Sequence, residues 1–406
     1  MYSILPISAV SSGLSIIIPL YILSLKGNAF DVGIAIALFN IIEIPASIFW
    51  GEITEKIGRT KLFILVSVVG VIPIFFLLYL IRSVVSIQAS YALYAFMATA
   101  ASPALNILIM GARKSRLPRY FSRYSVLVIL GSFIALVPGI FLTDGRLYEF
   151  LFFVLGLNIV SVIMALVLIS ADKRHMKKEQ RGEIKRSFSI LNLISVTPFV
   201  LTGHALINRI SAGLNDKKIK SVYILLSSVA LFNAGLYLFN TSYIPYLNEN
   251  FITYSGIFSI NLSNAVGQLL VYTVVIGLLS RLKLETYYNM SAWVRVLSYA
   301  IVFLPILSIV RNVFYVNLVA YAVAGIGYGL WNVSSSVLLY SHIKKMRPAH
   351  YIGIWSAILG VSAVVGSFLS GFVSNYIGYG YTFFMAIAAI FLSLIVFNKK
   401  IDSIRS

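Results

Sequence analysis

Apolar stretches of about twenty residues recur from one end of the chain to the other, separated by short polar connections. An α-helix rises about 1.5 Å per residue, so about twenty apolar residues cross the hydrocarbon core of a bilayer. Strands do not fit, because strands of a membrane barrel have about ten residues of alternating polarity. The pattern predicts twelve membrane-spanning helices, over residues 3–24, 31–52, 61–81, 88–110, 123–143, 147–170, 221–244, 254–279, 287–310, 314–340, 349–373 and 378–398.

The composition excludes other classes of protein. Of the 406 residues, 59% are hydrophobic and 11% are charged, whereas about 25% are charged in an ordinary soluble domain. A disordered chain is excluded as well, because disorder requires few apolar residues and many charges. The absence of Cys excludes disulfides and thiolate metal sites. We therefore predict an all-α polytopic membrane protein without an additional domain outside the membrane.

The net charge of +19 has an uneven distribution over the predicted loops. Of the 32 Lys and Arg residues, 27 lie in residues 51–61, 111–123, 171–220, 280–286, 341–348 and 399–406. The opposite loops contain only Lys26, Arg82, Arg146 and Arg311. Basic loops of membrane proteins face the cytoplasm. We therefore expect a plasma-membrane protein with both termini in the cytoplasm, and we attribute the basic charge to topology rather than to nucleic-acid binding.

The two sets of six spans are related by a weak internal repeat. Gly51 and Gly277 lie at equivalent span ends, and Pro118 and Pro348 precede equivalent spans, at offsets of 226 and 230 residues. Such an offset indicates a duplicated six-helix unit. We predict two pseudo-symmetric six-helix bundles, 1–170 and 221–406, joined by a cytoplasmic loop over 171–220. Within this loop we interpret residues 188–207 as an amphipathic helix on the membrane surface, with a further membrane crossing as the alternative.

The connection after the second span carries a recognisable motif, Gly-Glu-Ile-Thr-Glu-Lys-Ile-Gly-Arg-Thr-Lys over residues 51–61. It resembles the signature of the major facilitator superfamily, in the same loop of a twelve-span chain. The glycines and basic residues that match are Gly51, Gly58, Arg59 and Lys61, while Glu55 and Lys56 replace an Asp and an Arg. The resemblance in architecture covers the whole chain and implies a transporter.

The resemblance also implies that this loop helps to close the cytoplasmic side of the protein. Glu55 would then take the part of the family's acidic residue, with Arg113 at the end of the fourth span as its partner. In the second copy, Arg281 stands four residues after Gly277 where an acid is expected, so we predict an asymmetric gate. The alternative is that these charges only set the topology.

The resemblance further implies that spans 1, 4, 7 and 10 line a central cavity. Polar and aromatic residues at helical spacing mark one face of each of these spans and of span 8. The candidates for contact with the solute are Ser12, Asn106, Asn233, Tyr237, Asn240, Asn264, Gln268, Tyr328, Trp331 and Asn332. The alternative is that these side chains form hydrogen bonds between neighbouring helices.

Two ionisable residues lie well inside predicted spans. Glu43 stands near the membrane midplane, where an ionised carboxylate is costly, so we consider it a candidate for binding and releasing a proton. A structural carboxyl group is the alternative. Arg295 lies within span 9, and we expect its side chain to extend to the membrane interface.

These features predict a secondary active or facilitative transporter that moves a small organic solute by alternating access. A proton-coupled exporter of hydrophobic compounds is the alternative, although the fourth span lacks the Arg that many such exporters contain. A non-transporting membrane sensor is a second alternative. An enzyme is not expected, because no metal-ligand spacing occurs and none of the four His residues lies deep in a span. We expect no cofactor or metal, a monomer in the bilayer, and a neutral cavity suited to uncharged solutes.

Overall fold

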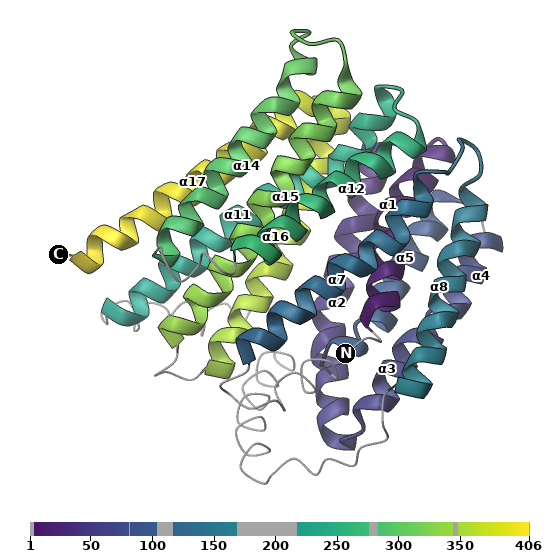
Figure 1. Ribbon diagram of the computed structural model, residues 1–406, viewed down its shortest axis with the longest axis horizontal. Helices are drawn as coiled ribbons and strands as arrows, with labels where there is room; N and C mark the ends of the chain where they lie inside the picture. The colour runs from purple at the N-terminus through teal and green to yellow at the C-terminus, as the bar shows by residue number, and fades with distance from the viewer. Residues whose placement is uncertain are drawn as a thin grey trace.

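The computed structural model describes residues 4–80, 82–103, 117–168, 217–275, 283–343 and 348–405. Within these ranges the regular structure is helical throughout, and no strand occurs. Figure 1 shows two bundles of long helices side by side. The first contains α1 (Ile4–Ser24), α2 (Ala29–Ile57), α3 (Thr60–Gly70), α4 (Ile72–Leu80), α5 (Val84–Ala98), α7 (Leu117–Gly139) and α8 (Leu147–Leu168). The second contains α11 (Lys217–Glu249), α12 (Tyr254–Leu270), the π-helical turn η2 (Val271–Val275), α14 (Leu284–Ile306), α15 (Val313–Ile343), α16 (Pro348–Tyr376) and α17 (Tyr379–Arg405).

The number of spans agrees with the hydrophobic pattern. Eleven helical segments in the described ranges are long and apolar enough to cross a membrane. The helices α3 and α4 form one of these segments, Thr60–Leu80, with a short break at Val71. The remaining span is α7, whose described apolar part is Tyr124–Gly139. The fold is therefore that of an all-α, multi-pass membrane protein.

One helix boundary differs from the predicted one. The apolar run stops at Gly51, but α2 continues to Ile57, so residues 51–57 form its last two turns and only residues 58–59 connect it to α3. The helix ends at Gly58, which has φ 70° and donates its backbone N–H to the carbonyl group of Thr54. Glu and Lys are good helix formers, and a residue with positive φ then ends the helix.

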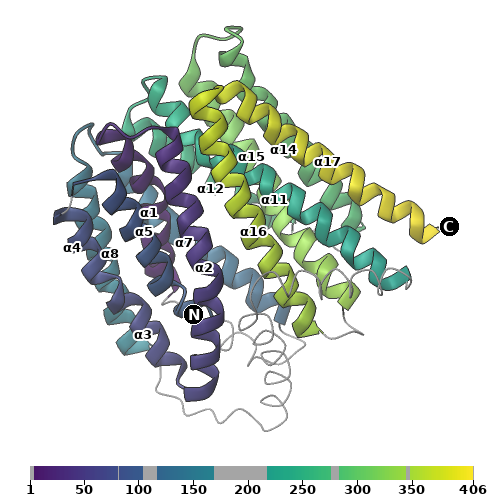
Figure 2. The ribbon, with the colours of Figure 1, turned by 180° about the vertical axis from the view of Figure 1, so that it is seen from behind.

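The two bundles meet along two pairs of helices. The helix α2 packs on α16, and α7 packs on α12, while α11 also touches α1 and α2. Each pair joins the second span of one half to the fifth span of the other, as expected for a duplicated unit. Figure 2 shows α2 beside α16 from behind. Below, "the halves" means residues 4–168 and 217–405.

Two sides of the molecule follow from the order of the helices. We call the side that carries the tight connections 25–28, 82–83, 140–146, 250–253, 307–312 and 377–378 the hairpin side. The opposite side carries the first residues of α1, the last residues of α17 and the connection 58–59, and we call it the terminal side.

Candidate functional site

The halves close together near the hairpin side through a pair of glycines. A Cβ atom added to Gly33 of α2 would lie 2.7 Å from the Cα atom of Gly371 in α16 and 3.0 Å from the carbonyl oxygen of Ser367. Because both glycines lack a side chain, the two backbones can approach this closely. The contact between α2 and α16 therefore depends on these two residues.

Aromatic and polar contacts extend this closure. The ring of Phe30 in α2 lies 5.9 Å from the ring of Phe368 and 6.0 Å from that of Tyr376, both in α16. In the second junction, the hydroxyl group of Ser255 in α12 donates to the carbonyl group of Ile140, just after α7. The backbone N–H of Tyr254, which donates to the Asp144 carboxylate, and the ring of Phe150, which packs on that of Phe258, add to this closure near the hairpin side.

The helices α1 and α11 show a change in accessibility near their middle. Toward the hairpin side, residues 16–22 of α1 and 241–247 of α11 are buried on all faces. Toward the terminal side, Ser11, Ser15 and Asn240 have exposed side chains. Both helices pack against helices of both halves. These polar side chains are therefore accessible at inner positions of the molecule.

Glu43 lies in the middle of α2 and faces tyrosines from both halves. Its carboxyl group lies near the hydroxyl groups of Tyr91 and Tyr94 in α5 and of Tyr237 in α11. The Glu43 side chain is exposed, and in the described ranges no Lys or Arg lies within salt-bridge distance of it. We call Glu43, Tyr91, Tyr94, Tyr237 and Asn240 the central site.

Hydroxyl and amide groups surround the central site. The hydroxyl oxygens of Ser11 and Tyr94 are 2.9 Å apart, and the Tyr321 hydroxyl donates to the Asn240 side-chain oxygen at 3.5 Å. Ser11 was missing from the sequence-based candidates. Ser11 and Ser12 each stand three or four residues from Ser8 and Ser15, so helical spacing alone could not decide which of them faces the other half.

Several predicted cavity residues have their polar groups bonded between helices. Asn233 of α11 donates to the carbonyl oxygen of Leu359 at 2.9 Å and to the hydroxyl group of Ser362 at 2.8 Å, both in α16. The hydroxyl oxygens of Ser12 in α1 and Ser132 in α7 are 2.7 Å apart. Each of these bonds joins two helices of the same half. Asn233 and Ser12 therefore form hydrogen bonds between neighbouring helices, as in the alternative interpretation of these residues.

The contact between α12 and α15 contains three more of the predicted residues. Asn264 donates to the carbonyl oxygen of Tyr321 at 3.0 Å, and Gln268 donates to the Asn264 side-chain oxygen at 2.7 Å. Asn332 donates to the Tyr272 hydroxyl group at 2.7 Å. The amide groups of this stripe therefore stabilise the helix pair.

The aromatic candidates of α15 differ in exposure. Trp331 is buried and stacks on Phe232 of α11, with ring centroids 4.9 Å apart. Tyr328 is half-buried and lies near Tyr237 of the central site. Tyr328, unlike Trp331, is thus placed next to the central site.

The motif at residues 51–61 lies at the terminal side. Gly51 is buried in α2. The exposed Lys56 lies 4.0 Å from Glu52 on the same helix, and Lys61 donates to the carbonyl oxygen of Leu166 in α8 at 2.6 Å. The described contacts of this motif therefore lie within the first half.

The remaining residues of the predicted gate either lie in the short connection after α2 or fall outside the described residues. Gly58 and Arg59 are exposed in the short connection between α2 and α3. The side chain of Glu55, all of Asn106 and Arg113, and the segment 188–207 lie outside the described residues. Pairing of Glu55 with Arg113 stays a prediction.

Arg295 is buried, so the expectation that it reaches the membrane interface is wrong. Its exposed fraction is 2%. Gly327 of α15 leaves room for its stem, because a Cβ atom there would lie 3.0 Å from Cγ of Arg295. The guanidinium carbon lies 5.5 Å from the ring centroid of Tyr299 and 5.9 Å from that of Tyr328. The side chain therefore lies inside the second half.

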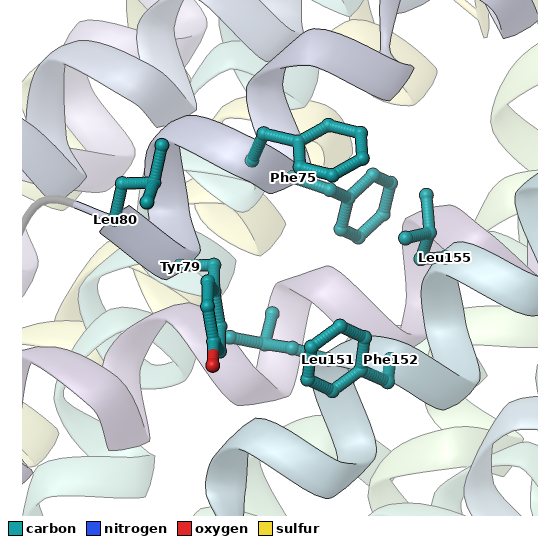
Figure 3. A pocket seen from close by; sticks show the side chains of 7 residues that line it. Phe75, Tyr79, Leu80, Leu151, Phe152 and Leu155 are labelled. Carbon is teal, nitrogen blue, oxygen red and sulfur yellow. The ribbon is translucent and has the colours of Figure 1, made fainter.

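A cavity of about 200 Å³ lies between α4 and α8, away from these polar groups (Figure 3). It is lined by Phe75, Phe76, Tyr79, Leu80, Leu151, Phe152 and Leu155. Most of these side chains are apolar, and Leu80 is 71% exposed at the surface. The cavity lacks the polar groups that orient a solute, so it is not the candidate site.

Comparison with solved structures identifies the fold. A POT family transporter in complex with a thioalcohol-conjugated peptide is 13% identical, with a TM-score of 0.74 over 99% of this chain and 95% of that chain. A POT family transporter in complex with 5-aminolevulinic acid is 15% identical, with a TM-score of 0.72 over 99% and 95% of the two chains. The nucleoside transporter NupG is 14% identical, with a TM-score of 0.66 over 100% and 98%.

Comparison at the level of sequence identifies the family. A search of curated proteins finds no match. The family model described as Major Facilitator Superfamily matches residues 2–346, which is most of the chain and includes the motif at residues 51–61. The chain therefore belongs to the Major Facilitator Superfamily, and it is a multi-pass membrane transporter rather than an enzyme.

Proposed function

We propose that the protein is a secondary active or facilitative transporter that moves a small organic solute across the plasma membrane by alternating access. In this mechanism two halves move against each other around a solute site between them. The proposed moving units are residues 1–170 and 221–406, with 171–220 as the connecting loop. We propose that the monomer is the working unit.

The observation that carries this proposal is the change in accessibility along α1 and α11. Both helices are buried on the hairpin side, and both have exposed polar side chains near the middle and beyond it, such as Ser15 and Asn240. A site that solute can reach from one side only is what alternating access requires. The glycine contact of α2 with α16 supports closure on the other side.

The charge distribution supports an assignment of this state. The predicted loops on the terminal side contain 27 of the 32 Lys and Arg residues, which supports a cytoplasmic location for this side and for both termini. The conformation described here would then be open to the cytoplasm and closed to the outside.

The central site supports a polar organic solute. Phenol, amide and carboxyl groups at Tyr237, Asn240 and Glu43 can bond to hydroxyl and amino groups of a solute, and tyrosine rings can stack on flat groups. The solved structures with this fold include complexes with a conjugated peptide and with 5-aminolevulinic acid, and a nucleoside transporter. These are small organic molecules with several polar groups.

The test is transport by the purified protein in liposomes. A panel of sugars, amino acids, short peptides, nucleosides and hydrophobic cations is first screened for an increase in melting temperature, because a ligand of the folded state stabilises it by mass action. Each hit is then measured for uptake into loaded vesicles. Saturable uptake that is lost in Asn240→Ala supports the proposal. Binding without uptake for every hit would instead support a sensor.

Glu43 favours a second candidate, a proton-coupled exporter of hydrophobic compounds. An acid without a basic partner in the described ranges, placed between the halves, can exchange a proton with either side as access alternates. The exporter predicts that a hydrophobic cation is the hit, that it competes with protons, and that it leaves the vesicle interior when a pH gradient is imposed.

A further inference from the structure

Arg295 has unused hydrogen-bonding capacity inside the second half. It is the largest fully buried side chain of the described residues. Its Nε and Nη1 atoms have no hydrogen-bond partner, and neither has the buried hydroxyl group of Tyr299 beside it. An arginine is charged at any pH of interest. Three unpaired polar atoms, two of them on one cation, therefore lie together in a site from which water is excluded.

In the part of the chain that the structure describes, Arg295 is surrounded by rings and has no acid within salt-bridge distance. Tyr299 and Tyr328 lie with their ring centroids within 5.9 Å of the guanidinium carbon, and Tyr321 interacts with it electrostatically. The salt bridges of the described residues involve Lys56 and Arg146 instead. Cation–π contacts offset part of the desolvation of a buried cation, but they leave its N–H donors unpaired, which is unfavourable in a membrane protein.

Arg295 is at the depth of the central site. Arg295, Glu43 and Tyr328 are each the middle residue of their helix. The helices are α14 with 23 residues, α2 with 29 residues and α15 with 31 residues. Tyr328 contacts Arg295 through its ring and lies near Tyr237 of the central site. Tyr328 therefore stands between the buried cation and the accessible polar groups, and it is only half-buried.

We propose that Arg295 binds an anionic group, a carboxylate or phosphate, of the transported solute, which reaches the guanidinium past the ring of Tyr328. This inference rests on the proposed transport function and specifies its solute class. Two N–H donors of an arginine fit two oxygens of such a group. The Tyr299 hydroxyl supplies a third donor. The neutral cavity expected from the sequence is thereby replaced by one with a cationic end.

The first test needs no knowledge of the solute. Replacing an unpaired buried cation with an apolar side chain of similar length removes an unfavourable group. Arg295→Met should therefore raise the melting temperature of the ligand-free, full-length protein in detergent. The matched control is Arg82→Met, because Arg82 also lies over a tyrosine ring, 5.0 Å from the centroid of Tyr148, but is exposed. A lower melting temperature for Arg295→Met would show that the cation–π contacts are structural and would overturn the proposal.

The second test uses matched probes, namely benzoate and phenyl phosphate, with benzamide as the neutral counterpart of benzoate. Benzoate or phenyl phosphate should stabilise the wild type and Arg82→Met, and binding should weaken about tenfold or more in Arg295→Met. Arg295→Lys, which keeps the charge, should retain part of the affinity. Equal stabilisation by benzamide, or an unchanged response in Arg295→Met, would contradict the proposal. Failure of both anions to bind the wild type would also contradict the proposal.

A third arm separates the failure of this proposal from that of the transport function. A cysteine at Ser15, an exposed position of α1 that is not part of the central site, reports on occupancy of the region between the halves, because the chain has no Cys. If a neutral solute from the panel protects Ser15→Cys and is transported while both anions fail, the transport function stands and the anion site is wrong. If no solute protects the cysteine or is transported, the transport function itself fails. Anionic lipid vesicles serve as a further arm: a thermal shift caused by lipid alone that is present in the wild type and absent in Arg295→Met would assign Arg295 to a headgroup and overturn the proposal.

Discussion

The carboxyl group of Glu43 in α2 and the hydroxyl group of Tyr237 in α11 lie near each other across the junction of the two halves, near the middle of the molecule. Each residue belongs to a different half, and each lies beyond the part of its helix that the hairpin-side contacts bury. Movement of one half against the other would therefore change the surroundings of both groups at once. This relationship supports the proposal that Glu43 takes up and releases a proton as access alternates.

Replacing Glu43 by Gln tests whether it carries the coupled proton. Gln keeps the shape and hydrogen bonds of the side chain but cannot release a proton, so uptake driven by a pH gradient should fall to the level without a gradient. Exchange of labelled for unlabelled solute at equal pH should continue, because it needs no net proton movement. Both assays use the protein in liposomes. A Gln variant that still responds to the gradient like the wild type would make Glu43 a structural carboxyl group.

Replacing Gly33 by Leu should weaken closure on the hairpin side. The new side chain would collide with the backbone of Gly371, so the closed contact becomes less favourable and the open population on this side rises. We expect labelling of Ser15→Cys from the hairpin side to increase about fivefold or more, corresponding to a shift of about 1 kcal/mol. Gly156→Leu in α8 is the control, since nothing lies within 4 Å of a Cβ atom there. Unchanged labelling in Gly33→Leu would contradict the closure described here.

Two asparagines of α11 should behave differently when replaced by Ala. Asn233 makes two hydrogen bonds to α16, so Asn233→Ala should lower stability by about 1 kcal/mol and reduce the melting temperature. Asn240 is exposed, so Asn240→Ala should leave the melting temperature unchanged and weaken solute binding. Thermal unfolding and a binding isotherm for both variants decide the matter. The reverse pattern would exchange the roles assigned to the two residues.

Replacing Gly51 by Leu should impair transport while expression is largely retained. Gly51 is buried near the end of α2, and added bulk there would hinder the approach of neighbouring helices on the terminal side. We expect the transport rate to fall about tenfold, equivalent to about 1.4 kcal/mol, with the variant present in the membrane at nearly the wild-type level. Full transport would remove the gating role from the motif.

The sequence predicts the fold well because membrane spans have a strong and simple signal. The apolar runs located the eleven helices of spanning length in the described ranges, including α3 and α4, where the run continues through the break at Val71. The boundary of α2 was less accurate. Helix formation continues for two turns beyond the apolar run, through Glu and Lys residues, and only the positive φ of Gly58 ends it.

The site is less predictable because the same residue types serve two purposes. Asn233 and Asn240 are seven residues apart and share a helix face, yet one bonds to α16 and the other is exposed. The difference depends on the depth at which the halves close, and a single helix carries no signal for that depth. The orientation of Arg295 likewise depends on Gly327 of another helix, so spacing along α14 could not reveal it.

The most direct measurement of the central claim is cysteine accessibility in oriented membranes. The natural chain has no Cys, so single cysteines at Ser15 and Asn240 can be labelled with a membrane-impermeant maleimide applied to each side, with Thr143→Cys as the exposed hairpin-side control. In the absence of solute, both sites should react from the terminal side and remain unreactive from the hairpin side. A transported solute should slow labelling of Ser15→Cys. Equal labelling from both sides, or labelling from the hairpin side alone, would contradict a site between the halves with alternating access.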